Sequence, residues 1–157
     1  MNDELWLAYQ RKLIFAGLDD FSGSGTLGDY VGGQSGSNGE LWWQEAVDFL
    51  YRNLISGLIE PNTVVHELPL DDPFVLCEIY AIMNPNINFP DGFPIWHLPY
   101  YIGTNKLSKL LRQHNAFGWE HFNDSLNIGL VDSLDVIYTD SNVKMSATPL
   151  IPIITSV

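Results

Sequence analysis

A chain of 157 residues with 46% hydrophobic residues is long enough for one hydrophobic core and too apolar to be disordered along its whole length. Its net charge of -12 disfavours duplex nucleic acid and anionic membranes as direct partners, because both are bound mainly through lysine and arginine. The single cysteine, Cys77, excludes an internal disulfide and a cysteine-based zinc site.

The first 39 residues predict a helix followed by a glycine-rich loop. In residues 3–17, Trp6, Tyr9 and Leu13 repeat at helical spacing. Eight of the thirteen glycines then fall within residues 17–39, where ordering the backbone costs much conformational entropy. We therefore expect a flexible loop, or a linker between the first helix and the rest.

Residues 23–28 of this loop contain the letters of a dinucleotide-binding fingerprint, G-x-G-x-x-G. That fingerprint binds pyrophosphate only between a strand and a helix. Because a helix precedes it here and more glycine follows, we interpret it as a loop without a nucleotide.

Residues 40–59 predict the clearest helix of the chain. Trp43 and Val47 belong to an apolar stripe whose members are three and four residues apart. A polar face lies opposite, where Asp48 and Arg52 have the i,i+4 spacing of a helical ion pair.

The segment that follows predicts a strand and a third helix. A short strand is expected at residues 63–66. Asp72 and Pro73 then form a helix-start signal, with aspartate as the cap and proline in the first turn. Residues 74–83 are apolar on nearly all sides, which is typical of a central, buried helix. Residues 84–100 contain four prolines and predict an irregular connection.

The last third of the chain predicts two more helices and an extended end. Thr104 caps a helix that ends at Gly118 and has a stripe formed by Leu107, Leu110, Leu111 and His114. Residues 119–138 are also expected to be helical, with Gly129 as the position at which that helix would break. The residues from Val143 onward have the proline and β-branched content of an edge strand.

Together these patterns predict a mainly α fold, α+β with minor β. We expect a single compact helical domain over residues 1–157, with a flexible Gly-rich loop at 17–39 after the first helix and an extended tail at 143–157. The N-terminus lacks the basic segment of a signal peptide, and no apolar run reaches about 18 residues. A cytoplasmic protein without a membrane span or a cofactor is therefore expected.

The distribution of charge is the strongest functional signal. Seventeen of the nineteen carboxylates lie in three windows without lysine or arginine, at residues 13–51, 53–105 and 113–143. Such a distribution predicts a broad negative field that attracts a cationic protein. In an unbroken helix over 119–138, Glu120, Asp124 and Asp135 would lie within about 60° of one another, and Asp132 would lie beside them. Like charges at this spacing cost stability, which favours a binding role over a merely solvated face.

Other candidate residues allow two interpretations each. Glu120, His121 and Asp124 are metal-ligand types, but their pattern matches no zinc motif, and His114 fits a hydrogen-bonded core position. Cys77 fits a buried, inert thiol better than a nucleophile. Asp71 and Asp72 cap a helix and can still face a partner. Two aromatic residues of the proline-rich connection are either hydrophobic anchors for a partner or part of the core. These are Trp96 and Tyr100.

The size, the acidity and the segment Leu41–Leu50, which leads to Gly57-Leu58-Ile59, give the chain a family resemblance. It resembles the small acidic immunity proteins that bacteria encode beside polymorphic or contact-dependent growth-inhibition toxins. The resemblance implies a non-enzymatic inhibitor in the cytoplasm that binds a basic toxin domain, often a nuclease, and covers its active site. It implies no role for any single residue.

The charge pattern and the aromatic residues, rather than the resemblance, indicate where a partner binds. The expected partner-binding residues are Glu120, Asp124, Asp132, Asp135, Asp140, Asp71, Asp72, Trp96 and Tyr100. Two alternatives remain open from the sequence: a nucleic-acid mimic that inhibits a host DNA-binding protein, and a small enzyme that uses the His121/Glu120/Asp124 cluster.

Overall fold

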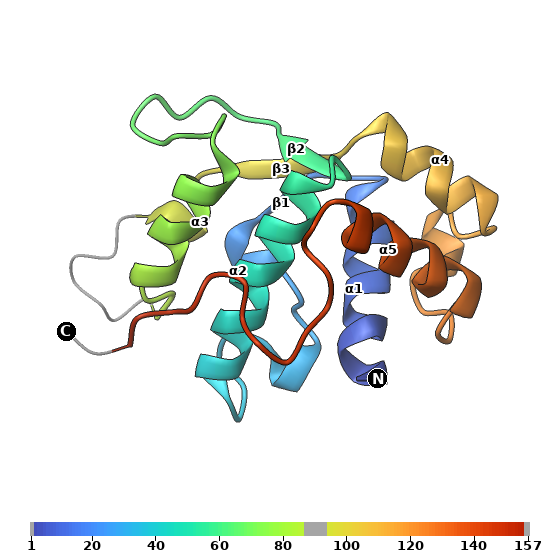
Figure 1. Ribbon diagram of the computed structural model, residues 1–157, viewed down its shortest axis with the longest axis horizontal. Helices are drawn as coiled ribbons and strands as arrows, with labels where there is room; N and C mark the ends of the chain where they lie inside the picture. The colour runs from blue at the N-terminus through green and yellow to red at the C-terminus, as the bar shows by residue number, and fades with distance from the viewer. Residues whose placement is uncertain (1, 87–93, 156–157) are drawn as a thin grey trace.

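The computed structural model describes residues 2–86 and 94–155 (Figure 1). In these ranges the mainly α prediction with minor β is confirmed. The helices are α1 (Asp3–Ala16), α2 (Gly39–Ile55), α3 (Pro73–Ile82), α4 (Asn105–Gln113) and α5 (Ile128–Asp140). The strands β1 (Phe21–Ser22), β2 (Ile59–Pro61) and β3 (Tyr100–Gly103) form one small antiparallel sheet in the order β1-β3-β2.

Each helix begins at a short polar residue whose side chain accepts a hydrogen bond from a backbone N–H of the first turn, which would otherwise be unpaired. The predicted caps Asp72 and Thr104 are confirmed, since they accept from the N–H groups of Val75 and Leu107. The first helix is capped by Asn2, whose side chain accepts from the N–H of Leu5. Local sequence is sufficient to place the starts at Asp72 and Thr104.

Helix α2 lies between α1 and α3 in the view of Figure 1, and its apolar face is at the centre of the core. Trp42 is fully buried, and its indole N–H donates to the carbonyl oxygens of Thr26 and Leu27 at 2.9 and 3.1 Å. The indole N–H of Trp43 donates to the carbonyl of Tyr80 in α3 at 2.9 Å. The tryptophans of α2 therefore join it both to the Gly-rich segment and to α3.

The Gly-rich segment packs against the core, so the linker, one of the two alternatives predicted for residues 17–39, is wrong. It contains β1 and two short 3₁₀ turns, and Phe21, Leu27 and Tyr30 are buried in the core cluster. These apolar residues between the glycines attach the segment to the core. A count of glycines alone does not show this. The G-x-G-x-x-G letters of residues 23–28 follow β1 but lead into a 3₁₀ turn and not into an α-helix.

Two boundaries in the middle of the chain also differ from the prediction. Helix α2 ends at Ile55 rather than residue 59, because Gly57 adopts a positive φ of 74° and turns the chain into β2. The short strand is therefore at Ile59–Pro61, not at residues 63–66.

Helix α3 is not buried on all sides. Phe74, Val75 and Ile82 are 47%, 40% and 52% exposed. Part of the proline-rich connection, residues 87–93, lies outside the described residues. None of the helices in the described ranges is both long enough and apolar enough to span a bilayer.

Residues 143–155, which we call the C-terminal strap, cross over α2 from the end of α5 toward α3 (Figure 1). The strap is extended but forms no strand with the described sheet. Its backbone N–H groups at Leu150, Ile151 and Ile153 bond instead to side chains of α2, and that of Ile154 bonds to the carbonyl of Ala81. The strap is thus held mainly by hydrogen bonds to side chains rather than by pairing with a strand. The prediction of an edge strand is therefore wrong.

Candidate functional site

The predicted acidic helix face over residues 119–138 does not form. Glu120 lies in a 3₁₀ turn at Trp119–His121, Asp124 lies in the turn after it, and α5 begins only at Ile128. The side chain of Asn127 accepts from the N–H of Leu130 and starts a new helix there. Glu120 and Asp124 are therefore separate from the carboxylates of α5.

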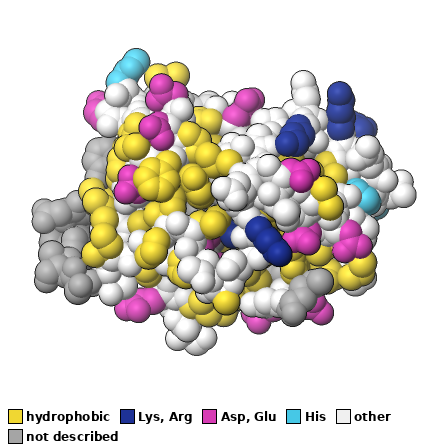
Figure 2. Space-filling view, in the orientation of Figure 1, with side chains coloured by type: hydrophobic (Ala, Val, Ile, Leu, Met, Phe, Trp, Pro, Cys, Tyr) yellow, Lys and Arg dark blue, Asp and Glu magenta, His cyan; other side chains and the backbone are white. Residues whose placement is uncertain are grey.

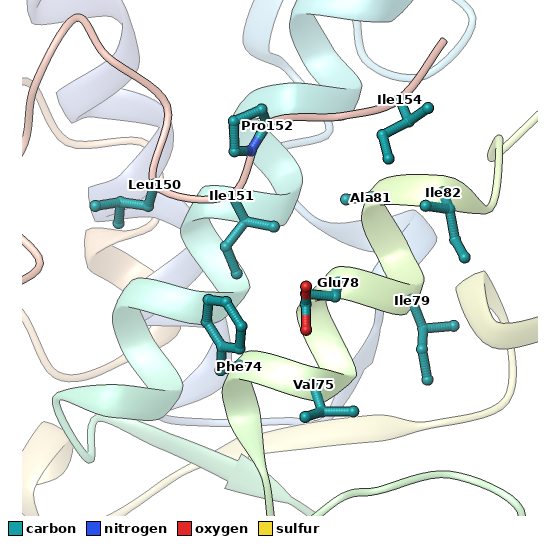
Figure 3. A pocket seen from close by; sticks show the side chains of 10 residues that line it. All are labelled: Phe74, Val75, Glu78, Ile79, Ala81, Ile82, Leu150, Ile151, Pro152 and Ile154. Carbon is teal, nitrogen blue, oxygen red and sulfur yellow. The ribbon is translucent and has the colours of Figure 1, made fainter. Parts of the chain in front are cut away.

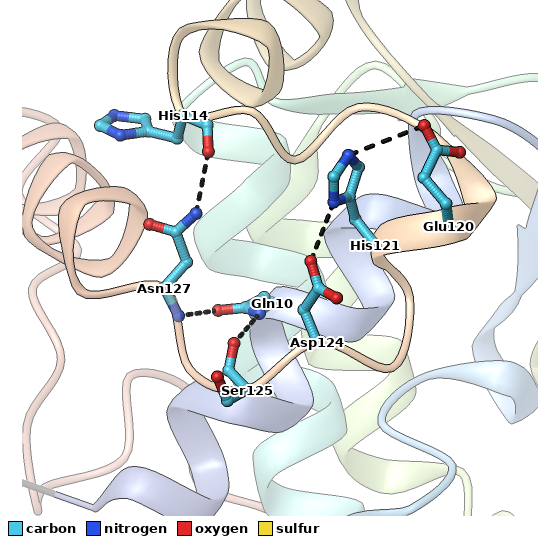
Figure 4. A network of polar contacts seen from close by, with 7 residues as sticks. All are labelled: Gln10, His114, Glu120, His121, Asp124, Ser125 and Asn127. Carbon is cyan, nitrogen blue, oxygen red and sulfur yellow. Dashed lines mark hydrogen bonds and ion pairs between the residues drawn. The ribbon is translucent and has the colours of Figure 1, made fainter.

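Glu120 and Asp124 flank the imidazole of His121 (Figure 4). His121 Nδ1 lies 2.8 Å from a carboxylate oxygen of Asp124, and Nε2 lies 3.7 Å from one of Glu120. Both carboxylates are largely exposed, and within residues 2–86 and 94–155 no group of three or more His, Cys, Asp or Glu side chains could hold a metal ion. The structure therefore shows a cluster of polar side chains at the surface here.

A second polar network in Figure 4 attaches this turn to the rest of the protein. The side-chain amide of Gln10 in α1 donates to the carbonyl of Ser125 and accepts from the N–H of Asn127. Asn127 donates to the carbonyl of His114, and His114 Nε2 lies 2.9 Å from the hydroxyl of Ser133. The prediction of a hydrogen-bonded histidine at 114 is confirmed, and the network has a structural role.

Asp132 and Asp135 of α5 line a cleft of about 510 Å³ together with a third carboxylate, that of Glu45 in α2. We call it the acidic cleft. Trp6 of α1 and Asn2, which caps that helix, form another wall, and Met145 of the strap closes one side. Asp132 and Asp135 are exposed, whereas Glu45 is half-buried. The sequence did not indicate Glu45, because only the folded chain brings α2 and α5 to the same cleft.

The environment of Glu45 disfavours its charged form. Burial, and then the negative charge of Asp48, raise the pKa of Glu45 from 4.5 to about 7, while the Arg52 guanidinium opposes the shift. A carboxyl group with a raised pKa binds a proton more readily in the folded state than in the unfolded state. Its contribution to stability is therefore complete below about pH 4.5 and is lost as the pH rises through 7.

We expect Glu45→Gln to stabilise the protein at pH 8 by about 1–2 kcal/mol, after allowance for partial solvent screening of a half-buried group. At pH 4 the variant and the parent should be equally stable, since glutamine imitates the protonated acid. Urea unfolding at the two pH values measures the difference. Glu40→Gln, at an exposed position in the same helix, is the control. It should leave the free energy of unfolding unchanged at both pH values. A gain of equal size at both pH values would contradict the assignment.

The polar residues of α2 that the sequence places opposite its apolar stripe are buried under the strap. Asp48 accepts from the backbone N–H groups of Leu150 and Ile151, both at 3.2 Å. Arg52 is only 2% exposed and donates to the carbonyl of Val143 at 2.6 Å. The predicted Asp48–Arg52 ion pair is wrong, because each side chain bonds to the strap instead of to the other.

The exposed face of α3 and the strap enclose a groove of about 430 Å³ that we call the apolar groove (Figure 3). Figure 2 shows hydrophobic side chains gathered over this part of the surface, with carboxylates at their edge. The groove has one charged lining residue, Glu78, whose side chain points into it. Its apolar lining consists of Phe74, Val75, Ile79, Ala81 and Ile82 of α3 and Leu150, Ile151, Pro152 and Ile154 of the strap.

The remaining predicted partner-binding residues lie apart from one another. Asp71 and Asp72 are exposed at the start of α3, and Asp140 is exposed at the end of α5. Tyr100 is 39% exposed on β3. Trp96 is only 2% exposed, and its indole N–H donates to the carbonyl of Met83, so it belongs to the core and is not a surface anchor.

The buried thiol of Cys77 has no catalytic partner among the described residues. Burial raises the pKa of the Cys77 thiol far above its ordinary value. The interpretation of Cys77 as an inert core residue is therefore favoured.

Basic side chains neutralise few of the carboxylates. Among the described residues, Arg11 and Asp29 form the only ion pair between a lysine or arginine and a carboxylate, at 2.6 Å. Arg52 is directed to the strap and to Tyr9, and Lys106 donates to the carbonyl of Ser56. Lys12 and Arg112 lie over phenylalanine rings. The negative field that the sequence predicts is thus not cancelled by local pairing.

No protein-family model, no curated protein and no solved structure matches this chain. Function is therefore inferred from the geometry and charge of the chain's own residues.

Proposed function

We propose that this protein is a non-enzymatic, cytoplasmic inhibitor that binds and neutralises a basic protein domain, a cognate bacterial toxin domain such as a nuclease. One observation carries the proposal: in a chain of net charge -12, a single carboxylate among the described residues is paired with a lysine or arginine. Unpaired carboxylates repel one another and lower stability, so a surface that keeps them favours a cationic partner.

The acidic cleft offers a place for a basic side chain of that partner. Glu45, Asp132 and Asp135 line it from two helices, and its volume of about 510 Å³ is ample for a lysine or an arginine. A cation seated between them would pair with exposed carboxylates at the rim and with the half-buried Glu45 inside. Contacts to a desolvated acid contribute more than rim contacts, which mainly raise the association rate.

A nuclease domain fits this surface for a physical reason. It must hold phosphates with lysine and arginine, so its active-site groove is cationic. An acidic protein can occupy that groove, and long-range attraction then accelerates the encounter. Covering the groove would exclude the substrate without any chemistry by the inhibitor.

Purification of the protein from its native host tests the proposal. We expect a basic protein encoded beside it to co-purify in stoichiometric amount and to lose its activity when the complex forms. Co-purification of a basic protein whose activity is unchanged would contradict inhibition, and loss of nuclease activity on titration with the pure protein would support it.

The association rate should depend on the acidic cleft. We expect the double variant Asp132→Lys/Asp135→Lys to bind the basic partner with an association rate about tenfold lower at low salt, because steering depends on the summed field at the binding face. High salt should reduce the rate of the parent and narrow this difference. Stopped-flow fluorescence at two salt concentrations measures both effects.

A matched control has the same change of charge away from the cleft. Asp19→Lys/Glu60→Lys alters two exposed carboxylates, one after α1 and one on β2. It should slow association far less than the cleft variant. Equal rates for the two double variants, or a rate insensitive to salt, would show that the acidic cleft does not face the partner.

A further inference from the structure

The apolar groove combines a large exposed apolar surface with a rigid wall. Phe74 and Ile82 are about half exposed, and Ile154 faces them from the strap with 55% exposed. Isolated apolar residues on a surface are ordinary, but a contiguous and hollowed apolar patch marks a binding surface. Its volume of about 430 Å³ is large enough to take the side chains of a docked segment.

The groove exists before any partner binds, because the strap is held in place from beneath. Gln44 of α2 donates to the carbonyl of Ile151 and accepts from the N–H of Ile153, both at 2.9 Å. The N–H of Ile154 donates to the carbonyl of Ala81 at 2.9 Å, which joins the strap directly to α3. Because the surface is already formed, little conformational entropy is lost when a partner binds.

The charge of the groove limits what can occupy it. Glu78 points into the groove from α3 and has no lysine or arginine partner among the described residues. Asp71 and Asp72 add two exposed carboxylates at the start of the same helix, and the sequence has no lysine or arginine between Arg52 and Lys106. An occupant must therefore bring its own cation, because burying Glu78 without one would be costly.

We propose that the apolar groove receives an amphipathic, cationic segment of a partner protein. Large apolar side chains of the segment pack between α3 and the strap, and a lysine or arginine pairs with Glu78. This inference rests on the proposed function in one respect, namely that the segment belongs to the basic domain. A second copy of this chain does not fit, since it would bring another net charge of -12 and another unpaired Glu78 to the contact.

A synthetic amphipathic Leu/Lys helix is the probe, and the same helix with glutamate in place of lysine is its control. We expect the Leu/Lys helix to bind and to shift amide NMR signals of α3 and of residues 150–154, whereas the Leu/Glu helix should not bind. Binding of both helices, binding of neither, or shifts confined to other elements would overturn the proposal.

Two substitutions test the groove itself. Glu78→Lys should weaken the Leu/Lys helix about tenfold and allow the Leu/Glu helix to bind, as expected for a charge pair at a partly desolvated contact. Ile82→Glu should also weaken the Leu/Lys helix, because it places a charge on the apolar wall. Val136→Glu is the matched control, since Val136 is an equally exposed β-branched residue on α5, outside the groove. This control should change the affinity for the Leu/Lys helix by no more than about twofold relative to the parent.

The outcomes separate this inference from the proposed function. Asp132→Lys/Asp135→Lys should not change binding of the Leu/Lys helix, because these residues line the acidic cleft and not the groove. If the Glu78→Lys and Ile82→Glu variants neutralise a basic domain with the same affinity as the parent, the groove inference fails and the proposed function stands. If the Leu/Lys helix binds as described and no basic domain is neutralised, the proposed function fails and the groove inference stands. A dimer in light scattering that Ile82→Glu dissociates would identify a second copy as the occupant and overturn the inference.

Discussion

Arg52→Met is expected to lower the free energy of unfolding by about 4 kcal/mol, the cost typical of removing one partner from a buried charged network. Arg52 Nε donates to the carbonyl of Val143 at 2.6 Å, Nη1 donates to the hydroxyl of Tyr9 at 2.6 Å, and Nη2 donates to the carbonyl of Lys144 at 3.2 Å. Methionine fills much of the same space but donates nothing. Two carbonyl oxygens of the strap would lose these donors.

Urea unfolding of the parent and the variant measures this loss. Lys109→Met removes the same charge from an exposed position on α4 and should change the free energy of unfolding by less than about 0.5 kcal/mol. We also expect Arg52→Met to make the strap more sensitive to proteolysis, because Val143 and Lys144 begin it. A loss below about 1 kcal/mol would show that apolar packing at this position replaces the hydrogen bonds.

Gly33→Ala is expected to lower the free energy of unfolding by about 2–3 kcal/mol, through backbone strain and a steric clash together. Gly33 has a positive φ of 75°, which alanine adopts only with strain. A Cβ atom at this position would also lie 2.6 Å from the carbonyl oxygen of Gly28. That oxygen belongs to the backbone and cannot move away cheaply.

The matched control lies in the same segment. Gly28→Ala introduces a Cβ with no heavy atom within 4 Å and at no positive φ, so we expect it to be neutral or slightly stabilising. Thermal unfolding of the two variants compares them directly. If Gly33→Ala were as well tolerated as Gly28→Ala, the Gly-rich segment would behave as the flexible loop that the sequence alone suggests.

Features governed by neighbouring residues could be predicted from the sequence. The helix starts at Asp72 and Thr104 follow from a side chain that pairs with the backbone N–H three residues later in the chain. The excess of carboxylates over basic residues is a property of composition, and over residues 2–86 and 94–155 only one carboxylate is paired with a lysine or arginine. These predictions needed no knowledge of distant contacts.

Features of the candidate site that depend on distant segments could not be predicted. The polar face of α2 looks solvent-facing by its spacing, but the strap, about one hundred residues later in the chain, covers Asp48 and Arg52. The hydrophobicity of α3 predicts burial on nearly all sides, yet Phe74 and Ile82 remain about half exposed. Periodicity identifies a face of a helix and does not say what, if anything, packs against it.

The sequence by itself therefore determined the mainly α class, the helix starts at Asp72 and Thr104 and the large negative net charge, because each depends on composition or on residues within one helical turn. Only the tertiary structure decided that Glu45 joins Asp132 and Asp135 in one cleft and that Glu78 points into an apolar groove. Both depend on the strap crossing α2, an arrangement fixed by hydrogen bonds between side chains and a distant backbone. Such contacts leave no periodic pattern in a single sequence.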